Sequence, residues 1–302
     1  MLDLIVLGSI TEDLIITPKE EKRFIGGVPV YAAATAKVLN SSLGIVSKVG
    51  VDFHLKNLDV LNSFSADLNG FKIEGQTSMK FENKYSPKGK RTQKLLSTSE
   101  KIFFYDIPES YFQSHCIHLG PVFNEINTDL LVKIRDRFKL VSLDGQGFTR
   151  SIEKGSKKII LKPWLNYSEY LPLIDILKVD DTELMGITAT TNLDKAIDLV
   201  LKTDLKFLVI TRAHKGAIIY HNNQRYDIPA VPTTVVDETG AGDTFITAFL
   251  LEYLRTKDCY YSALMAACTA SYKISHLGPI PNYTRDDVIS KLKSIYPDFI
   301  EK

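Results

Sequence analysis

Long apolar runs are missing from this sequence. No stretch approaches the roughly 20 apolar residues that a membrane-spanning helix needs. The short run Leu4 to Leu7 follows Asp3, where a secretory signal would carry lysines. We therefore expect this run to be a strand and the protein to have no membrane partner.

Cysteine and net charge are also scarce. The three cysteines, Cys116, Cys259 and Cys268, stand in apolar surroundings without CxxC spacing, which argues against a disulfide framework and a zinc site. The 37 basic and 36 acidic residues leave a net charge of +1. Such a chain lacks the basic field with which proteins hold nucleic acid. We predict a cytoplasmic protein with no nucleic-acid partner.

Several enzyme motifs are absent as well. The sequence has no GxxxxGK[ST], no HRD and DFG pair, no GxSxG and no HExxH, which excludes P-loop kinases, protein kinases and the hydrolases that carry those motifs. After the first predicted strand Gly8 is followed by Ser9-Ile10-Thr11. The dinucleotide fingerprint is therefore missing, which argues against a Rossmann dehydrogenase.

What is present is the pattern of an α/β protein. Apolar runs rich in Ile, Val and Leu alternate with amphipathic stretches, which is typical of parallel strands covered by helices on both faces. We predict strands at 4–7, 44–49, 116–119, 140–143, 174–179 and 207–211. Predicted helices are at 28–39, 127–138, 181–186, 192–202, 244–254 and 260–276. We expect residues 1–302 to form a single domain.

One polar segment interrupts this pattern. Residues 69–100 contain alternating stretches such as 77–82 and 91–96, separated by Ser86-Pro87-Lys88-Gly89. They predict antiparallel strands joined by a turn. Such an insertion, at about 70–100 and with 13–25 as a candidate addition, is either a lid over a ligand or a surface hairpin without a role.

The most informative stretch is Asp237-Glu238-Thr239-Gly240-Ala241-Gly242-Asp243, which precedes a helical run. Gly240 and Gly242 free the backbone, and the unpaired amides of a helix start attract an anion. Asp243 beside that site would take a proton from a nucleophile while the amides stabilise a transferring phosphoryl group. The simpler alternative is an Asp that caps a helix after a glycine turn.

This stretch resembles the DTxGAGD motif of the ribokinase family, also called PfkB carbohydrate kinases. The resemblance implies a three-layer α/β/α fold with a mainly parallel sheet and a small β-lid. It also implies that Asp243 is the general base and that the amides of Gly240, Ala241 and Gly242 form an anion hole.

Further motifs resemble those with which the family binds the acceptor substrate. Asp13 matches the Asp of GSxxxD, which holds substrate hydroxyls, and Gly26 and Gly27 match GGxxxNxA. Tyr31 stands where that motif has Asn; it either enters the pocket and favours a flat ring or a cyclitol, or packs behind the glycine turn. Gln146 belongs to a DxQGxxR stretch similar to that of an inositol-kinase-like branch. Its last residue, Arg150, would meet a phosphate or pair with an acid.

The resemblance also implies which residues bind the phosphoryl donor and its Mg²⁺. Asp180 and Glu183 occupy the place of NxxE, which organises Mg²⁺, although two acids at this spacing also cap helices. The VTxGxxG-like stretch and the C-terminal motif region would bind the nucleotide. Their residues are Thr211, Ala213, Gly216, Asp237, Thr239 and Gly278. We interpret His214 as a surface turn residue.

The sequence thus predicts an ATP-dependent kinase for a hydroxyl of a sugar, cyclitol such as myo-inositol, or nucleoside. ATP and Mg²⁺ are the implied cofactors, and the resemblance allows a monovalent cation. We expect a monomer or a homodimer through the lid. The alternatives are a catalytically silent member that binds a sugar or nucleotide, and a sugar-phosphate kinase that uses Arg91, Lys94 and Arg150.

Overall fold

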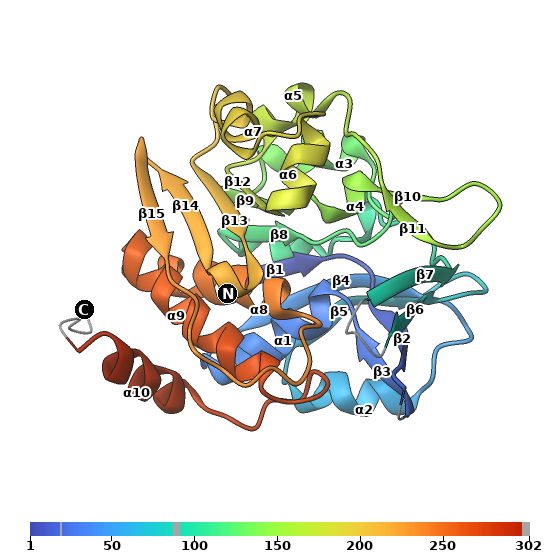
Figure 1. Ribbon diagram of the computed structural model, residues 1–302. Coiled ribbons are helices and arrows are strands. Elements are labelled where there is room, and N and C mark those ends of the chain that lie inside the picture. The colour runs from blue at the N-terminus through green and yellow to red at the C-terminus, as the bar shows by residue number, and fades with distance from the viewer. Residues whose placement is uncertain (19, 87–90, 298–302) are drawn as a thin grey trace.

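The apolar runs of the sequence form a nine-stranded sheet in the computed structural model, which describes residues 1–18, 20–86 and 91–297 (Figure 1). Strands from β13 to β5 are parallel, and β14 and β15 are antiparallel to their neighbours at one edge. The order is β15 (Gln224–Ile228), β14 (Ala217–His221), β13 (Phe207–Thr211), β12 (Ile176–Asp180), β9 (Leu140–Asp144), β8 (Cys116–Leu119), β1 (Leu4–Leu7), β4 (Leu43–Val49) and β5 (Asp67–Ile73).

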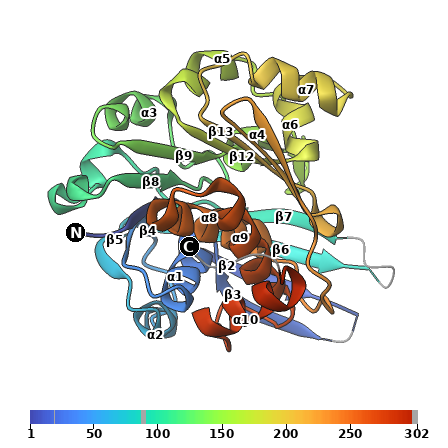
Figure 2. The ribbon, with the colours of Figure 1, turned by 90° about the vertical axis from the view of Figure 1, so that its left-hand side faces the viewer.

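Helices cover both faces of this sheet and enclose two apolar cores, so the predicted three-layer arrangement with a mainly parallel sheet is confirmed (Figures 1 and 2). One layer consists of α1 (Val28–Val38), α2 (Lys56–Ser63), α8 (Ala241–Thr256), α9 (Cys259–Ile274) and α10 (Arg285–Ile295). The other consists of α3 (Thr128–Arg135), α4 (Gln146–Thr149), α5 (Tyr167–Tyr170), α6 (Asp181–Ile187) and α7 (Leu193–Val200).

A second, small sheet stands beside the body and has the order β3 (Glu21–Gly26), β2 (Thr11–Ile16), β6 (Met79–Tyr85) and β7 (Arg91–Ser97). The pairs β2–β3 and β6–β7 are antiparallel, and β2 runs parallel to β6. The chain therefore enters this small sheet twice. Residues 67–73, which the sequence analysis places partly in the insertion, form β5 of the large sheet instead. Of the predicted turn at 86–89, residues 87–89 lie outside the described residues.

A short hairpin that the sequence analysis did not predict borders the small sheet. It consists of β10 (Arg150–Ile152) and β11 (Ile159–Leu161). The backbone N–H of Leu95 in β7 donates to the carbonyl of Lys157, in the loop of this hairpin. The hairpin thus links the small sheet to the segment that follows α4.

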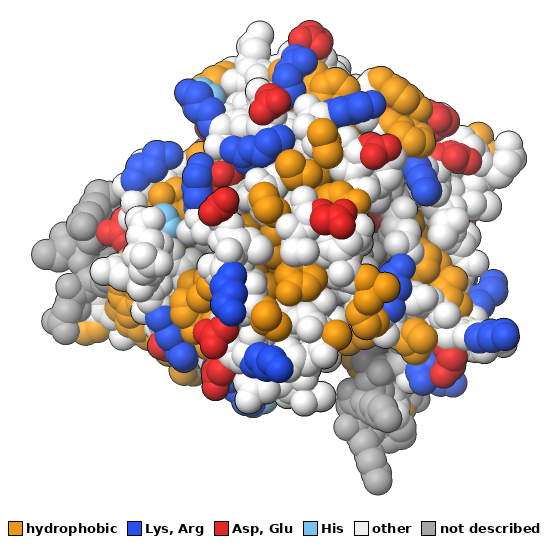
Figure 3. All heavy atoms as spheres, turned by 90° about the horizontal axis from the view of Figure 1, so that it is seen from above, with side chains coloured by type: hydrophobic (Ala, Val, Ile, Leu, Met, Phe, Trp, Pro, Cys, Tyr) orange, Lys and Arg blue, Asp and Glu red, His pale blue; other side chains and the backbone are white. Residues whose placement is uncertain are grey.

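Within the described parts of the chain, no helix is both long enough and apolar enough to cross a membrane. On the face that Figure 3 shows, lysines and arginines are interspersed with aspartates and glutamates. This distribution agrees with the balanced charge of the sequence, since charges of one sign do not gather on this face.

Candidate active site

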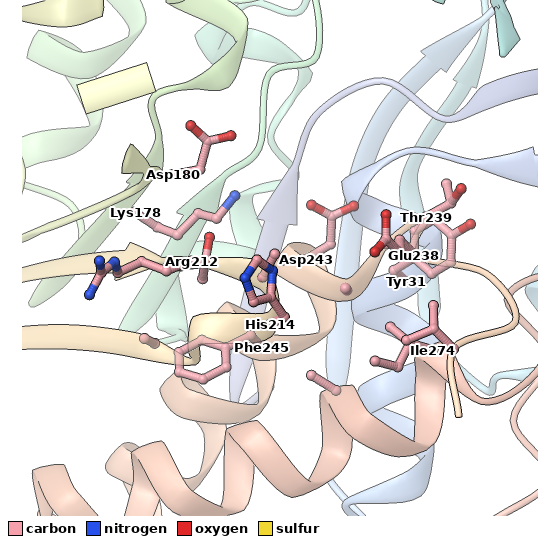
Figure 4. A pocket seen from close by; sticks show the side chains of 18 of the residues that line it. Tyr31, Lys178, Asp180, Arg212, His214, Glu238, Thr239, Asp243, Phe245 and Ile274 are labelled. Atoms are coloured by element: carbon pink, nitrogen blue, oxygen red, sulfur yellow. The ribbon is translucent and has the colours of Figure 1, made fainter. Parts of the chain in front are cut away.

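The carboxyl ends of β9, β12 and β13, the start of α8 and the small sheet surround a cavity of about 870 Å³. Ligands of parallel α/β sheets bind at this edge because the loops and helix starts gather there. Charged side chains stand near the middle of the cavity, and Figure 4 shows Lys178 and Asp243 directed toward one another from opposite elements. The two ends of the cavity are built differently.

The start of α8 supplies backbone donors at the centre of the cavity. Gly240 has the left-handed φ of 77° before the first helical residue, and a Cβ atom there would collide with the Tyr31 ring. The N–H of Ala241, which the resemblance places in the anion hole, instead donates to the carbonyl of Glu238. The amides of Gly242 and Asp243 are then the next helix-terminal donors, and both residues line the cavity. This geometry suits an anion.

Asp243 is the third residue of α8 and lines the same cavity. Burial raises the pKa of its carboxyl to about 6, against the opposing effect of the Lys178 ammonium. A carboxyl with a pKa just below neutrality is ionised at pH 7 and still basic enough to accept a proton, which is the property of a general base.

Lys178 is a site residue that sequence reasoning missed. It lies in β12, is 6% exposed, and its Nζ donates to Asp144 Oδ2 at 2.8 Å. A Cβ atom on Gly242 would lie 3.0 Å from this ammonium, so the glycine makes room for it. Burial lowers the pKa of Lys178, but Asp144, Glu183 and Asp243 outweigh this effect and raise it. The available signal was a charged residue inside an apolar strand.

Asp180 and Glu183 form a capping box at the start of α6. The Glu183 N–H donates to Asp180 Oδ1 at 2.6 Å, and the Asp180 N–H donates to Glu183 Oε2 at 2.9 Å. Both residues also line the cavity, and burial raises the pKa of Glu183 to about 7. The cap uses one oxygen of each carboxyl. Mg²⁺ is usually held by one or two carboxylates together with substrate phosphates and water, so this pair fits such an ion, although the described residues contain no cluster of three ligating side chains.

One end of the cavity is formed by β2, the turn before α1 and the small sheet. Asp13 and Gly27 line it, and a Cβ atom on Gly26 would lie 2.6 Å from Asp13 Oδ2. Gly26 itself does not line the cavity. Its role is to leave space for the Asp13 carboxylate, which is a correction to its predicted contact with substrate.

The small sheet adds four lining residues that the sequence analysis did not identify, namely Thr11, Phe81, Asn83 and Gln93. Asn83 is 2% exposed, and its Oδ1 accepts a hydrogen bond from Gln93 Nε2 at 3.0 Å. The two amides carry further donors and acceptors. Neighbouring Lys94 and Glu82 are not among the lining residues and form an ion pair at 3.0 Å with each other.

Gln146 and Arg150 complete this end. Arg150 Nη2 donates to Gln146 Oε1 at 2.5 Å, and its Nη1 donates to the carbonyl of Val122 at 3.3 Å. Val122 is held in turn, because its N–H donates to the buried carboxylate of Glu125 at 2.7 Å. Arg150 therefore lines the cavity while it is tied to two neutral oxygens.

The opposite end of the cavity is lined by many small and apolar residues, together with Arg212 and Lys215. Thr211, Ala213 and Gly216, for which the resemblance implies nucleotide binding, line this end, and His214 lies at its exposed rim. Three small residues of α9 also contribute to this wall. They are Ala267, Ala270 and Ser271.

Two residues predicted to bind the nucleotide instead hold the loop before α8. Asp237 Oδ1 accepts from the N–H of Thr239 at 2.9 Å, and its Oδ2 accepts from the N–H of Gly278 at 3.3 Å. Neither Asp237 nor Gly278 lines the cavity, whereas Thr239 does. Burial raises the pKa of Asp237, but the Lys273 ammonium and these amides outweigh it, so the pKa lies below its ordinary value.

The sequence left two positions open for Tyr31, in the pocket or packed behind the glycine turn, and the structure shows part of each. Its side chain is 3% exposed, lines the cavity, and has its ring against Gly240. Figure 4 places it beside Thr239 and Glu238, near the start of α8. The ring therefore supports the turn that carries the backbone donors and offers the cavity only part of its surface.

Comparisons with known proteins identify related sequences and related folds. The family model described as pfkB family carbohydrate kinase matches residues 149–285. A cytidine kinase of Thermococcus kodakarensis is 27% identical, over 84% of this chain and 90% of its own length. A probable fructokinase-4 of Arabidopsis thaliana is 36% identical, over 74% and 72% of the two chains.

A solved pyrophosphate-dependent kinase in the ribokinase family, complexed with a pyrophosphate analog and myo-inositol, has the same fold. Its TM-score is 0.82 at 23% identity, over 95% of this chain and 99% of that one. The sequence match to the fructokinase and the shared fold together establish the relationship. This chain belongs to the PfkB family of carbohydrate kinases, phosphotransferases whose acceptor is a hydroxyl group.

Proposed function

We propose that this protein transfers the terminal phosphoryl group of ATP to a hydroxyl of a small, unphosphorylated ring compound, a cyclitol or a nucleoside. The observation that carries the proposal is the position of Asp243. Its carboxyl, with a pKa of about 6, stands at the start of α8, lines the cavity and is directed toward the Lys178 ammonium.

In the proposed reaction the Asp243 carboxylate accepts the proton of the acceptor hydroxyl. The hydroxyl oxygen forms a bond to the γ-phosphorus, the bond from that phosphorus to the β,γ-bridging oxygen breaks, and ADP leaves with that electron pair. Because the transferred group carries negative charge throughout, its stabilisation is the main task of the protein. The amides of Gly242 and Asp243 and the Lys178 ammonium are the groups we assign to this task.

Asp180 and Glu183 are the residues we propose to hold Mg²⁺, which would neutralise phosphate charge when it is bound. One oxygen of each carboxyl is used by the capping box, which fixes the two side chains on the first turn of α6. A rigid pair of this kind is suited to an ion that also takes ligands from phosphate and water.

For the donor, we propose that the wall containing Ala267, Ala270 and Ser271 accommodates a flat base. Thr211, Ala213, Gly216 and Thr239 would border the nucleotide. Small side chains leave space for a planar ring and add apolar contact. Since a structure with the same fold is described as pyrophosphate-dependent, inorganic pyrophosphate belongs in the same donor assay.

For the acceptor, the neutral amides of Asn83, Gln93 and Gln146 favour a ring with several hydroxyls, held together with Asp13. The related proteins are named for cytidine and fructose or bound to myo-inositol. A sugar-phosphate acceptor is less favoured. Lys94 pairs with Glu82 outside the cavity and Arg150 is tied to Gln146, while the side chain of Arg91 lies outside the description.

We further propose that the small sheet acts as a lid on a single domain and closes over the acceptor. It supplies Phe81, Asn83 and Gln93 to the cavity wall, so its position decides whether the acceptor is enclosed. Exclusion of water would prevent hydrolysis of the donor in place of transfer. The outer strands of this sheet are also where a homodimer would form.

The test is release of ADP or phosphate measured over a matrix of donors and acceptors. The donors are ATP, GTP and pyrophosphate, and the acceptors are myo-inositol, cytidine, adenosine, ribose, fructose and fructose 6-phosphate. We expect the highest kcat/KM for myo-inositol or a nucleoside, with Asp243→Asn as the inactive control. A clear preference for fructose 6-phosphate contradicts the acceptor class. Binding of ligands without transfer for every pair supports the catalytically silent alternative instead.

A further inference from the structure

A buried lysine lies directly behind the start of α8. Lys273, in the last turn of α9, is 3% exposed. Its Nζ is 3.2 Å from both the backbone carbonyl oxygen and the Oδ2 of Asp237. The same ammonium stands 5.5 Å from the centre of the Tyr31 ring. One positive charge is therefore held by a carbonyl, a carboxylate and an aromatic face.

The partners of Lys273 also contact the segment 237–242, which leads into α8 and Asp243. Asp237 also accepts the N–H of Thr239, and the Tyr31 ring fills the space beside Gly240. The loop 237–242 is thus fixed from behind by the ammonium and its two partners. A carboxylate that is 7% exposed needs such a partner, because an unpaired buried charge is strongly destabilising.

The oxygens that hold this ammonium are of the type that bind an alkali cation. Carbonyl and carboxylate oxygens replace the hydration shell of K⁺ in proteins. Here both oxygens of Asp237 that face α9 are already occupied by a covalently attached cation. A second cation at the same oxygens would stand close to a buried positive charge, where repulsion is weakly screened. The monovalent cation that the family resemblance allows therefore does not fit at this loop.

We infer that the Lys273 ammonium is a built-in cation that positions the 237–242 loop, so that this protein needs no alkali cation for phosphoryl transfer. The inference deepens the proposed function and rests on it. Lys273 does not line the cavity, so it is a positioning residue that acts through Asp237 and the turn at Gly240. Against the effect of burial, its charge also lowers the pKa of the Asp243 carboxyl.

The first test uses the wild-type protein. Transfer is measured in buffer whose only monovalent cation is tetramethylammonium, and again with about 0.1 M KCl at equal ionic strength, which keeps screening constant. We expect kcat to agree within about twofold, far less than the roughly 10²-fold effect of a displaced catalytic group. Strong stimulation by K⁺ would overturn the inference while it leaves the proposed function intact.

The second test removes the ammonium with Lys273→Met. Without K⁺ we expect kcat to fall by about tenfold or more, because displacement of the loop by about 1 Å has effects of that size. K⁺ should restore part of the loss, whereas Li⁺, at equal ionic strength, should restore much less. An unchanged kcat, or a loss that no cation repairs, argues against the positioning role.

A matched control is Lys48→Met. Lys48 is 1% exposed, and its Nζ lies 2.9 Å from Asp106 Oδ2 and 5.5 Å from the centre of the Phe103 ring. The same change there removes a comparable buried contact at a residue that does not line the cavity. It should create no cation dependence. Thermal stability gives a readout that does not require activity: K⁺ should raise the melting temperature of Lys273→Met and leave that of the wild type unchanged. A Lys273→Met protein that K⁺ does not stabilise contradicts the inference even if no acceptor is found.

Discussion

The region around Asp243 and the acceptor end of the cavity consist of different chemical groups. Around Asp243 the protein uses backbone amides and a buried charge pair, Lys178 with Asp144. At the acceptor end the Asp13 carboxylate and Arg150 stand among neutral amides, and the small sheet contributes two of these amides, Asn83 and Gln93. A charge centre of this kind tolerates little change, because each buried charge depends on its partner. Neutral amides can be exchanged with much smaller effects, so we expect reaction chemistry and substrate choice to separate by mutation.

Asp243→Asn gives the largest expected effect in the charge centre. Loss of the general base should lower kcat by about 10² to 10⁴-fold for every acceptor, with little change in donor binding. The same variant should unfold at a higher temperature than the wild type at pH 7, because the amide replaces a carboxylate whose pKa is raised to about 6 by folding. Near-normal turnover by a folded variant would remove Asp243 from the mechanism.

Lys178→Met should come next, with kcat lowered by about 10²-fold, the usual effect of removing one donor to the reacting charge. Unlike Asp243→Asn, this variant should be less stable than the wild type, because Asp144, which is 0% exposed, loses its partner. The double variant Lys178→Met/Asp144→Leu should regain stability but not activity. If the double variant is active, the lysine serves only the fold.

Changes at the acceptor end should be smaller and selective. Asn83→Leu removes buried hydrogen-bonding groups, and we expect the KM of the acceptor to rise by about 5- to 50-fold, corresponding to roughly 1 to 2 kcal/mol. The KM of the donor should not change. The matched control is Lys94→Leu on the same sheet, whose side chain does not line the cavity. Equal effects of both variants on donor and acceptor would mean that the two parts do not separate.

The pH dependence should be the smallest effect. With a pKa of about 6 for Asp243, kcat/KM should rise with pH below 6 and level off above it. Stability should follow the opposite course, because the folded pKa lies above the ordinary value of 3.8. The contribution of this group is complete below about pH 3.8 and is lost as the pH rises through 6. Asp243→Asn should lack this part of the pH dependence of unfolding.

Much of the fold was readable because strands buried on both faces leave continuous apolar runs. The runs at 4–7, 116–119 and 207–211 correspond to β1, β8 and β13. The hairpin β10–β11 was missed, because strands of three residues are too short to show a strand period in the sequence.

The site could be predicted from the sequence where residues adjacent in the chain form it together, as in the stretch around Gly240 and Asp243. Lys178 and Lys273 were missed for a physical reason. Their partners, Asp144 and Asp237, are 34 and 36 residues away along the chain. These charges become ion pairs only in the folded protein, where β9 lies beside β12 and α9 lies behind the loop that contains Asp237.

Two separate segments of the chain, 11–26 and 79–97, form the small sheet. A chimera that exchanges acceptor specificity with a relative must therefore transplant both segments together. Replacing one alone would place a foreign strand against the β2–β6 junction and leave its cross-strand partners mismatched. The same topology gives a route to a split protein: a cut in the connection between β6 and β7 would leave the β2–β6 pairing on the N-terminal fragment and β7 on the other.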